Sequence, residues 1–468
     1  MGYEGENSVM IINPRVGIYI AVLLSPLVLP VAFASEDVGS SFETFRWNED
    51  YRYLSEKSQL SAYENLKYQP VEIAGQVGFV SFGGAVRSRI NVYDNDRFGL
   101  QGGSDGGTFL QRFYGHSDLQ LGGFRVFVEL SADYADSDGD LAPGPFDKDR
   151  AALGQLFFDW QSGDSRWRIG RQEVGLGSAR LMGTRDGSNV RRSYDGLRWD
   201  VPYGGAQWQV FYLQQVDVEE GSFDNSSHHD ESVWGLNSTW ALSRGSADLY
   251  YLGLDRKDAM YVQGVDRETR HSVGMRLYGT QSGWDWDFEA LYQFGDFGDS
   301  DIRAWTVASR VGYRFSNARG QPRIALSTNV ASGDSDPGDD RLQTFNPLFP
   351  NLAYFEEAAI HAPQNFYNFE PEISWRLTSR LALALDWNFF WRLKKDDAVY
   401  VRGLRPLPGT TDVPGHFVAH TPSVSLDYQW SRYVSMDLSV SHFFAREVIK
   451  QAGGDDAVFY KVQIEWKF

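Results

Sequence analysis

The chain has 468 residues, of which 62 are Asp or Glu and 44 are Lys or Arg, so its net charge is −18. This charge excludes nucleic acid as a partner, because phosphate binding requires a cationic surface, and the lack of cysteine excludes disulfide scaffolds, thiolate metal sites and thiol nucleophiles. An aromatic content of 15% together with 47 glycines favours an all-β protein.

A signal peptide is predicted at residues 1–34. Its apolar run closes with the small residues Ala32 and Ala34, which is the pattern of an exported precursor cut after Ala34. Pro26 and Pro30 interrupt the run and argue against a membrane anchor helix. The mature chain is therefore expected to contain no transmembrane helix.

Two further regions follow in chain order. Residues 35–83 are polar and aromatic, and they form either a periplasmic extension or a partial plug of a barrel. Residues 84–468 alternate apolar and polar residues with a period of two, most clearly at 381–392, and this period predicts strands. Eighteen strands are expected, at 84–93, 109–121, 123–133, 152–162, 165–171, 194–201, 206–217, 231–243, 246–256, 270–281, 283–295, 301–316, 321–332, 365–378, 380–393, 416–431, 433–445 and 456–468.

The connections between these strands alternate between short and long, with one exception near residues 295–300. A soluble sandwich has no reason to sort its loops in this way, whereas outer-membrane barrels have short turns on one rim and long loops on the other. We therefore predict an all-β transmembrane antiparallel β-barrel over residues 84–468, with about 18 strands, short periplasmic turns and long extracellular loops. Its outer face would contact outer-membrane lipid, and the loops at 172–193, 333–364 and 394–415 would face outside the cell.

A barrel of this size is too wide for its own side chains to fill, so a water-filled pore is its default function. Arginines recur on the polar faces assigned to the lumen, and a guanidinium group binds carboxylates in a bidentate way, which suits an anionic substrate. The alternative is that lumen carboxylates such as Glu129, Asp159 and Asp200 neutralise them, and about half are expected to be structural ion pairs. The lumen arginines are Arg87, Arg89, Arg112, Arg125, Arg168, Arg198, Arg276, Arg310, Arg314, Arg323, Arg376 and Arg392.

A calcium site is a weaker possibility in one acidic loop. Asp136, Asp138, Asp140 and Asp147 stand at relative positions 1, 3, 5 and 12 of a calcium-binding loop, but position 6, which needs glycine, is Leu141. A solvated acidic loop is the better interpretation. No metal and no cofactor are therefore expected.

Catalytic motifs of the common kinds are missing from the sequence. His116, Ser117 and Asp118 are adjacent, but strand alternation points Ser117 to lipid and the other two to the lumen, which breaks the geometry of a nucleophile and its base. The protein is not expected to be an enzyme.

Several long stretches resemble the alginate-export family of bacterial outer-membrane porins. They include VSFGGAVRSRINVYDN at 80–95, RIGRQEVGLGSARLMGTRDGSNVRRSYDGLRWD at 168–200, ASGDSDPGDDRLQTFNPLFP at 331–350 and LDWNFFWR at 385–392. The resemblance implies an 18-stranded barrel whose basic lumen passes an acidic uronate polymer. It also implies pore positions at Arg171, Arg191, Arg192, Arg198 and Arg392.

Together these observations predict a porin of the bacterial outer membrane for export or diffusion of an anionic polysaccharide or oligosaccharide, alginate or a similar polyuronate. Periplasmic secretion components are further candidate partners. The alternatives are a general or small-solute channel, and a plugged barrel that serves as an adhesin or scaffold.

Overall fold

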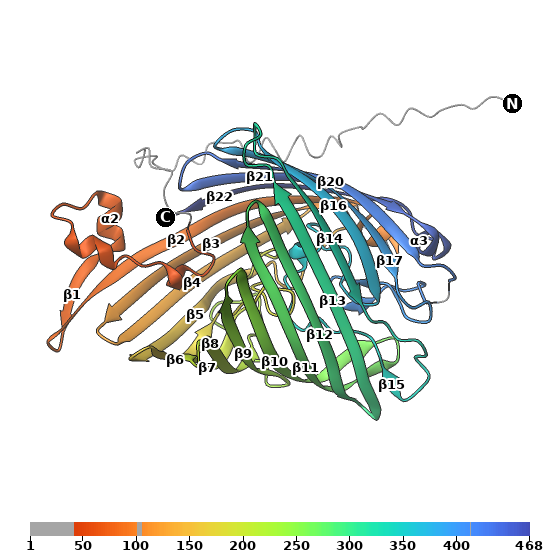
Figure 1. Cartoon of the computed structure of the whole chain (residues 1–468), viewed down its shortest axis with the longest axis horizontal. Helices are drawn as coiled ribbons and strands as arrows, with labels where there is room; N and C mark the ends of the chain where they lie inside the picture. Colours follow the sequence, from red (N-terminus) through yellow and green to blue (C-terminus); the bar gives the residue numbers. More distant parts are fainter. Residues whose placement is uncertain (1–41, 101–104, 412) are drawn as a thin grey trace.

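The wall of the molecule is a closed antiparallel β-barrel (Figure 1). The computed structural model describes residues 42–100, 105–411 and 413–468, so the predicted signal peptide lies outside the described residues. Each barrel strand pairs with the next one along the chain, and β2 pairs with β22 from Ala85↔Lys467 to Asp94↔Val458, which closes the ring. Closure leaves no unpaired sheet edge within the membrane, as a spanning sheet requires.

Eighteen strands of the described chain build this wall, one at each predicted place. They are β2 (Gln76–Asp94), β3 (Gly106–Leu121), β4 (Phe124–Ser137), β5 (Asp149–Ser162), β6 (Ser165–Gln172), β7 (Tyr194–Tyr203), β8 (Ala206–Gln215), β9 (Glu231–Leu242), β10 (Gly245–Tyr261), β11 (Gly264–Gln281), β12 (Trp284–Phe297), β13 (Ser300–Arg314), β14 (Arg323–Ala331), β16 (Phe366–Arg376), β17 (Leu381–Arg392), β20 (Phe417–Gln429), β21 (Val434–Ala445) and β22 (Ala457–Lys467). The predicted fold class and strand number are confirmed. No helix among the described residues is long and apolar enough to span a membrane.

The alternation of side chains along the strands separates a lipid face from a lumen face. On β12, Trp284, Phe288 and Tyr292 are exposed on the outside of the barrel. Between them, Asp285 and Asp287 point inward, where they accept hydrogen bonds from Arg323 of β14 and Arg276 of β11. A membrane barrel needs this order, because apolar side chains then meet lipid and charged ones meet lumen water.

One predicted long loop, at residues 257–269, is instead a tight hairpin between β10 and β11. The two strands stay paired as far as Tyr261↔Gly264, past a β-bulge that follows Arg256. Ala259 and Tyr261 pack there with the apolar side chains of Phe297, Ile302 and Leu342. This apolar cluster stabilises an extension of the wall that the polar sequence of the segment did not indicate.

Several of the remaining long loops turn inward. They carry short elements: η3 (Asp96–Gly99), β15 (Arg341–Leu342), η4 (Leu352–Tyr354), β18 (Tyr400–Val401), β19 (Arg405–Pro406) and α3 (Glu447–Gln451). Met182, Phe349 and Val401 of three different loops join one apolar core with inner-wall residues such as Leu252 and Phe390. The loops at 172–193, 333–364 and 394–415, which are predicted to face outside the cell, all contribute apolar side chains to this interior core. The inner wall is apolar near the outer rim, and burying that surface against the loops is favourable.

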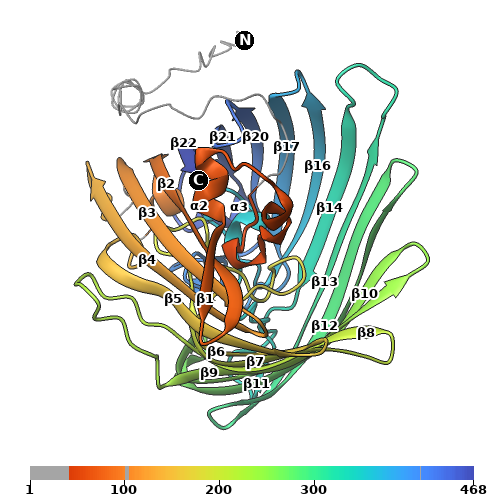
Figure 2. The same cartoon turned by 90° about the vertical axis from the view of Figure 1, so that its left-hand side faces the viewer.

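The N-terminal segment (residues 42–75) lies across the opposite mouth, at the end of the short turns (Figure 2). It contains η1 (Arg46–Asn48), η2 (Arg52–Glu56), α2 (Ala62–Lys67) and β1 (Gln69–Ile73). β1 forms a hairpin with β2, which for that reason begins at Gln76 rather than at the predicted residue 84.

Two residues attach the N-terminal segment to the barrel. Arg46 donates to the carbonyl oxygens of Gly84 and Phe468, both at 2.9 Å, and so bridges the seam between the first and last strands. Trp47 is 4% exposed, and the Arg168 guanidinium lies 3.8 Å from its ring centroid and 3.6 Å from that of Phe157. Such cation–π contacts are strongest when both groups are desolvated, as they are here.

Candidate functional site

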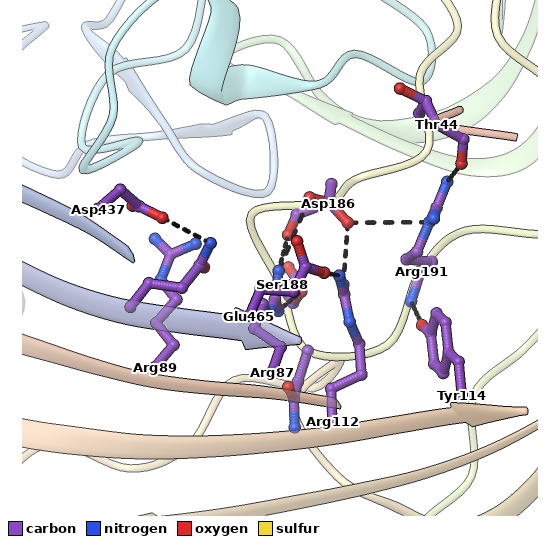
Figure 3. Close-up of polar contacts among 12 residues, drawn as sticks. Thr44, Arg87, Arg89, Arg112, Tyr114, Asp186, Ser188, Arg191, Asp437 and Glu465 are labelled. Carbon is purple, nitrogen blue, oxygen red and sulfur yellow. Dashed lines mark hydrogen bonds and ion pairs between the residues drawn. The ribbon is translucent and has the colours of Figure 1, made fainter. Parts of the chain in front are cut away.

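Three arginines meet around one carboxylate inside the barrel (Figure 3). We call Arg87 of β2, Arg112 of β3 and Arg191 the arginine cluster, and residues 173–193, which connect β6 to β7 and carry Arg191, the lumen loop. The carboxylate belongs to Asp186 at the tip of that loop. Its distances are 2.9 Å to Arg112 Nη1, 3.7 Å to Arg87 Nη1 and 3.8 Å to Arg191 Nε.

Strand register explains why an anion is needed at this place. Arg87 and Arg112 are directly opposite each other on the paired strands β2 and β3. Two like charges in that position repel each other and destabilise the sheet. Asp186 lies close to both guanidinium groups and offsets the repulsion, and Glu465 of β22, 3.5 Å from Arg112 Nη2, contributes from the other side.

The lumen loop is held mainly through backbone groups. Arg87 donates to the carbonyl oxygens of Asp186 and Ser188 at 2.7 and 2.8 Å. Asn189 is fully buried, and its amide donates to the carbonyl oxygens of Gln111 and Tyr134, both at 3.0 Å. The tip carrying Asp186 is thus fixed against β2, β3 and β4.

Exposure differs sharply within this group of charges. The Arg87 and Arg112 side chains are 1% and 3% exposed, whereas the Asp186 side chain is 48% exposed. Burial would raise the pKa of the Asp186 carboxyl, but Arg112, followed by Arg87 and Arg191, lowers that pKa below its usual value. The site is a buried set of guanidinium groups whose carboxylate partner is accessible to solvent.

Most of the other predicted pore arginines are neutralised. Each of these pairs with a carboxylate at 2.9 Å or less, as the structural alternative expected: Arg125 with Asp118, Arg168 with Asp159, Arg171 with Asp195, Arg198 with Asp200, Arg276 with Asp287, Arg310 with Glu372 and Arg323 with Asp285.

The remaining predicted arginines differ in their surroundings. Arg89 donates to Asn91 and lies 3.7 Å from Glu357, while Arg314 donates to the Gln321 carbonyl. Arg376 is exposed, and its side chain has no ion-pair or hydrogen-bond partner within the described chain.

Arg192 and Arg392 serve loop backbone rather than the lumen. Arg192 donates to the carbonyl oxygens of Gly183 and Phe349, which links the lumen loop to the loop before β16. Arg392 is 1% exposed and donates to the carbonyl oxygens of Gly415, Thr410 and Val413. Sequence reasoning placed both on the substrate pathway because it could not locate these carbonyl groups.

A second stretch of the lumen is acidic. Glu372 of β16 is directly opposite Asp386 of β17, and Asp427 of β20 is directly opposite Asp437 of β21. Lys461 binds Asp437 at 2.6 Å, and Arg310 and Arg323 bind Glu372. The lumen therefore has separate basic and acidic stretches rather than a uniform arginine ladder.

The acidic loop considered for calcium is arranged differently from a calcium site. Asp138 accepts a hydrogen bond from the Gly107 N–H, and Asp147 accepts one from the Gly144 N–H. Asp136 and Asp140 are exposed. In the part of the chain that the structure describes, no three His, Asp or Glu side chains gather in a way that could hold a metal ion.

Sequence reasoning missed Asp186, the residue on which the cluster converges. Its signal was present in the segment TRDGSNVRR at 184–192, where a single acidic residue stands among arginines in a long loop. Only the inward fold of that loop places the carboxylate between Arg87 and Arg112.

Comparisons with known proteins agree with this architecture. A family model described as alginate export matches residues 79–463. No curated protein sequence matches the chain significantly. Similar solved structures include OccK5 (OpdH) of Pseudomonas aeruginosa, with 12% identity over 83% of this chain and 98% of that one and a TM-score of 0.54. A BenF-like porin from Pseudomonas fluorescens Pf-5 has 11% identity, coverage of 83% and 99%, and a TM-score of 0.56. OccK2 (OpdF) of Pseudomonas aeruginosa, solved in complex with glucuronate, has 12% identity, coverage of 83% and 98%, and a TM-score of 0.55.

Proposed function

The chain belongs to the alginate export family, and from that premise we propose that its lumen passes an anionic carbohydrate, alginate or a similar polyuronate. Membership makes the protein an outer-membrane porin, a channel and not an enzyme. The identity of the solute is the part that we add.

The arginine cluster is the observation that carries this proposal. Its guanidinium groups already surround a carboxylate, which is the charged group that every uronate residue presents. Guanidinium groups bind carboxylates through strong, charge-assisted hydrogen bonds. The glucuronate complex of a porin with a similar fold, OccK2, supports the same class of solute.

The N-terminal segment partly closes the periplasmic mouth in this proposal. Support comes from its attachment through Arg46 and Trp47, and from Thr44, whose carbonyl oxygen accepts a hydrogen bond from Arg191 at 3.2 Å. A solute that enters from the periplasm would therefore pass this segment before it reaches the arginine cluster.

The apolar core formed by the loops favours a second candidate, a barrel whose lumen is permanently plugged and whose role is that of a scaffold. Conductance separates the two. Purified protein in a planar bilayer should give discrete channel openings if solutes pass, whereas a permanent plug gives none.

The solute is tested by block of those openings with glucuronate and with short uronate oligomers. Arg112→Gln should weaken the block by about tenfold or more, because a hydrogen bond to a charged group contributes roughly 1.5–3 kcal/mol. Arg303→Gln is the matched control, since Arg303 lies on an exposed part of β13 and pairs with the exposed Asp301. Equal block by neutral and acidic oligomers, or a wild-type channel that prefers cations, would contradict the proposal.

A further inference from the structure

We infer that Asp186 is a tethered carboxylate that occupies the arginine cluster until the carboxylate of a passing substrate displaces it. The inference rests on the proposed function and deepens it, because it names the residues that bind the substrate and the group that competes with it. The ligand used to test it is glucuronate, a sugar with a single carboxylate.

The first support is that the carboxylate can leave while the lumen loop stays in place. Arg87 holds the loop through the carbonyl oxygens of Asp186 and Ser188, and Asn189 holds it through three further carbonyl oxygens. None of these hydrogen bonds uses the Asp186 side chain. Displacement therefore requires rotation of one side chain rather than movement of the loop.

The second support is that the arginine cluster retains unused donors. The Nε–H groups of Arg87, Arg112 and Arg191 are buried and have no hydrogen-bond acceptor among the described residues. Arg112 Nη1 is 2.9 Å from Asp186 but also lacks an aligned acceptor. Buried donors without partners are costly, so a ligand that supplies more acceptor oxygens than Asp186 gains from pairing with them.

The third support is access. The Asp186 side chain is 48% exposed, whereas those of Arg87, Arg112 and Arg191 are 1%, 3% and 11% exposed, so a solute meets the carboxylate first. Other nearby carboxylates are less exposed: the Glu173 side chain, which binds Arg191 at 2.7 Å, is 4% exposed, and that of Glu465, which binds Lys467 at 2.9 Å, is 12% exposed. Asp186 is thus the acid that exchange would replace.

Exchange of one carboxylate for another keeps the charge of the cluster constant. Without Asp186, the directly opposed Arg87 and Arg112 would face each other with less compensation whenever no substrate is bound. The tethered group would also lower the net affinity for each uronate unit, and a polymer needs such moderate affinity if it is to move on through the pore.

The test measures block of single channels by sodium glucuronate for the wild type, Asp186→Asn and Asp186→Glu. Asp186→Asn should lower the half-blocking concentration by about tenfold, because the internal competitor has lost its charge. It should also shift the reversal potential in a KCl gradient further toward anion preference. Asp186→Glu, which retains a carboxylate, should stay near the wild type.

Asp340→Asn is the charge-matched control, because its side chain is 87% exposed in a loop. Asp186→Ser provides a second neutral variant if the asparagine variant folds poorly. A wild-type channel blocked by glucuronate, with equal or weaker block in both neutral variants, would overturn the inference and leave the proposed function standing; Asp186 would then only position the arginines. A lack of block in every variant would overturn the proposed function itself.

Discussion

Arginine residues inside this barrel differ in role according to the group that each guanidinium contacts. In the arginine cluster the guanidinium groups lie close to a solvent-accessible carboxylate, and Arg87 also binds loop carbonyl oxygens. Arg192 and Arg392 instead bind buried loop carbonyl oxygens. Carbonyl oxygens cannot be displaced by a solute without unfolding of the loop. Arg192 and Arg392 therefore stabilise the loops that shape the lumen.

Replacement of Arg392 by Lys should loosen the loop between β17 and β20. The Arg392 side chain satisfies three carbonyl oxygens from a planar group, and a lysine ammonium cannot reach all three. Carbonyl oxygens left without hydrogen-bond partners should lower the stability of the folded loop by about 1–3 kcal/mol. Hydrogen exchange of the amides at 397–411 should accelerate in Arg392→Lys and remain unchanged in Arg380→Lys, because Arg380 is exposed in a turn. Equal exchange in both variants would show that the loop does not depend on Arg392.

The N-terminal segment buries a lysine while it is docked on the barrel. Lys67 ends α2 and is 0% exposed, and its ammonium group lies 5.1 and 5.5 Å from the ring centroids of Tyr51 and Tyr63. Burial, with a further contribution from Arg46, lowers the pKa of Lys67 from 10.5 to about 7. The charged form is therefore disfavoured while the segment is docked.

Docking of the N-terminal segment should weaken as the pH falls toward 7. A released Lys67 has a pKa near 10.5, so between pH 10.5 and about 7 the released form binds more protons than the docked form. Docking then strengthens with rising pH across this window, by up to about 1.4 kcal/mol per pH unit, and is constant below it. Because the chain contains no cysteine, a spin label on Ser55→Cys reports on this segment alone.

The label should become more mobile at pH 6 than at pH 9 in the otherwise unchanged protein. Lys67→Met should abolish that difference, and Lys57→Met should preserve it, since the Lys57 side chain is 47% exposed. A pH response that persists in Lys67→Met would assign it to another group.

The barrel as a whole depends on the separation of its lipid and lumen faces. Leu326 is 38% exposed on the outside of β14, and the next residue, Ser327, points into the lumen beside Arg310. Leu326→Asp should therefore lower the free energy of unfolding of the barrel by about 1–3 kcal/mol, because it places a charge in lipid. Ser327→Asp should lower it by less. Unfolding in urea, followed by the heat-modifiable mobility of the folded barrel on gels, measures the difference. Equal losses for the two neighbours would contradict the assignment of the faces.

Local patterns in the sequence determined the wall of this protein. The period of two, the short turns and the resemblance at 168–200 were enough to predict eighteen strands. Each strand must place apolar side chains toward lipid on one face and polar side chains toward water on the other. That requirement acts residue by residue and so is visible without a structure. The extended hairpin of β10 and β11 could not be predicted in this way, because the apolar cluster that stabilises it gathers residues from segments far apart in the sequence.

Only the tertiary structure decided what lies inside the wall. Arg87 binds the Ser188 carbonyl 101 positions away, and Arg192 binds the Phe349 carbonyl 157 positions away. No local pattern encodes such contacts, because they arise when the loops fold inward to cover the apolar inner wall near the outer rim. The same folding places Asp186 between two arginines that the strand register alone would leave facing each other.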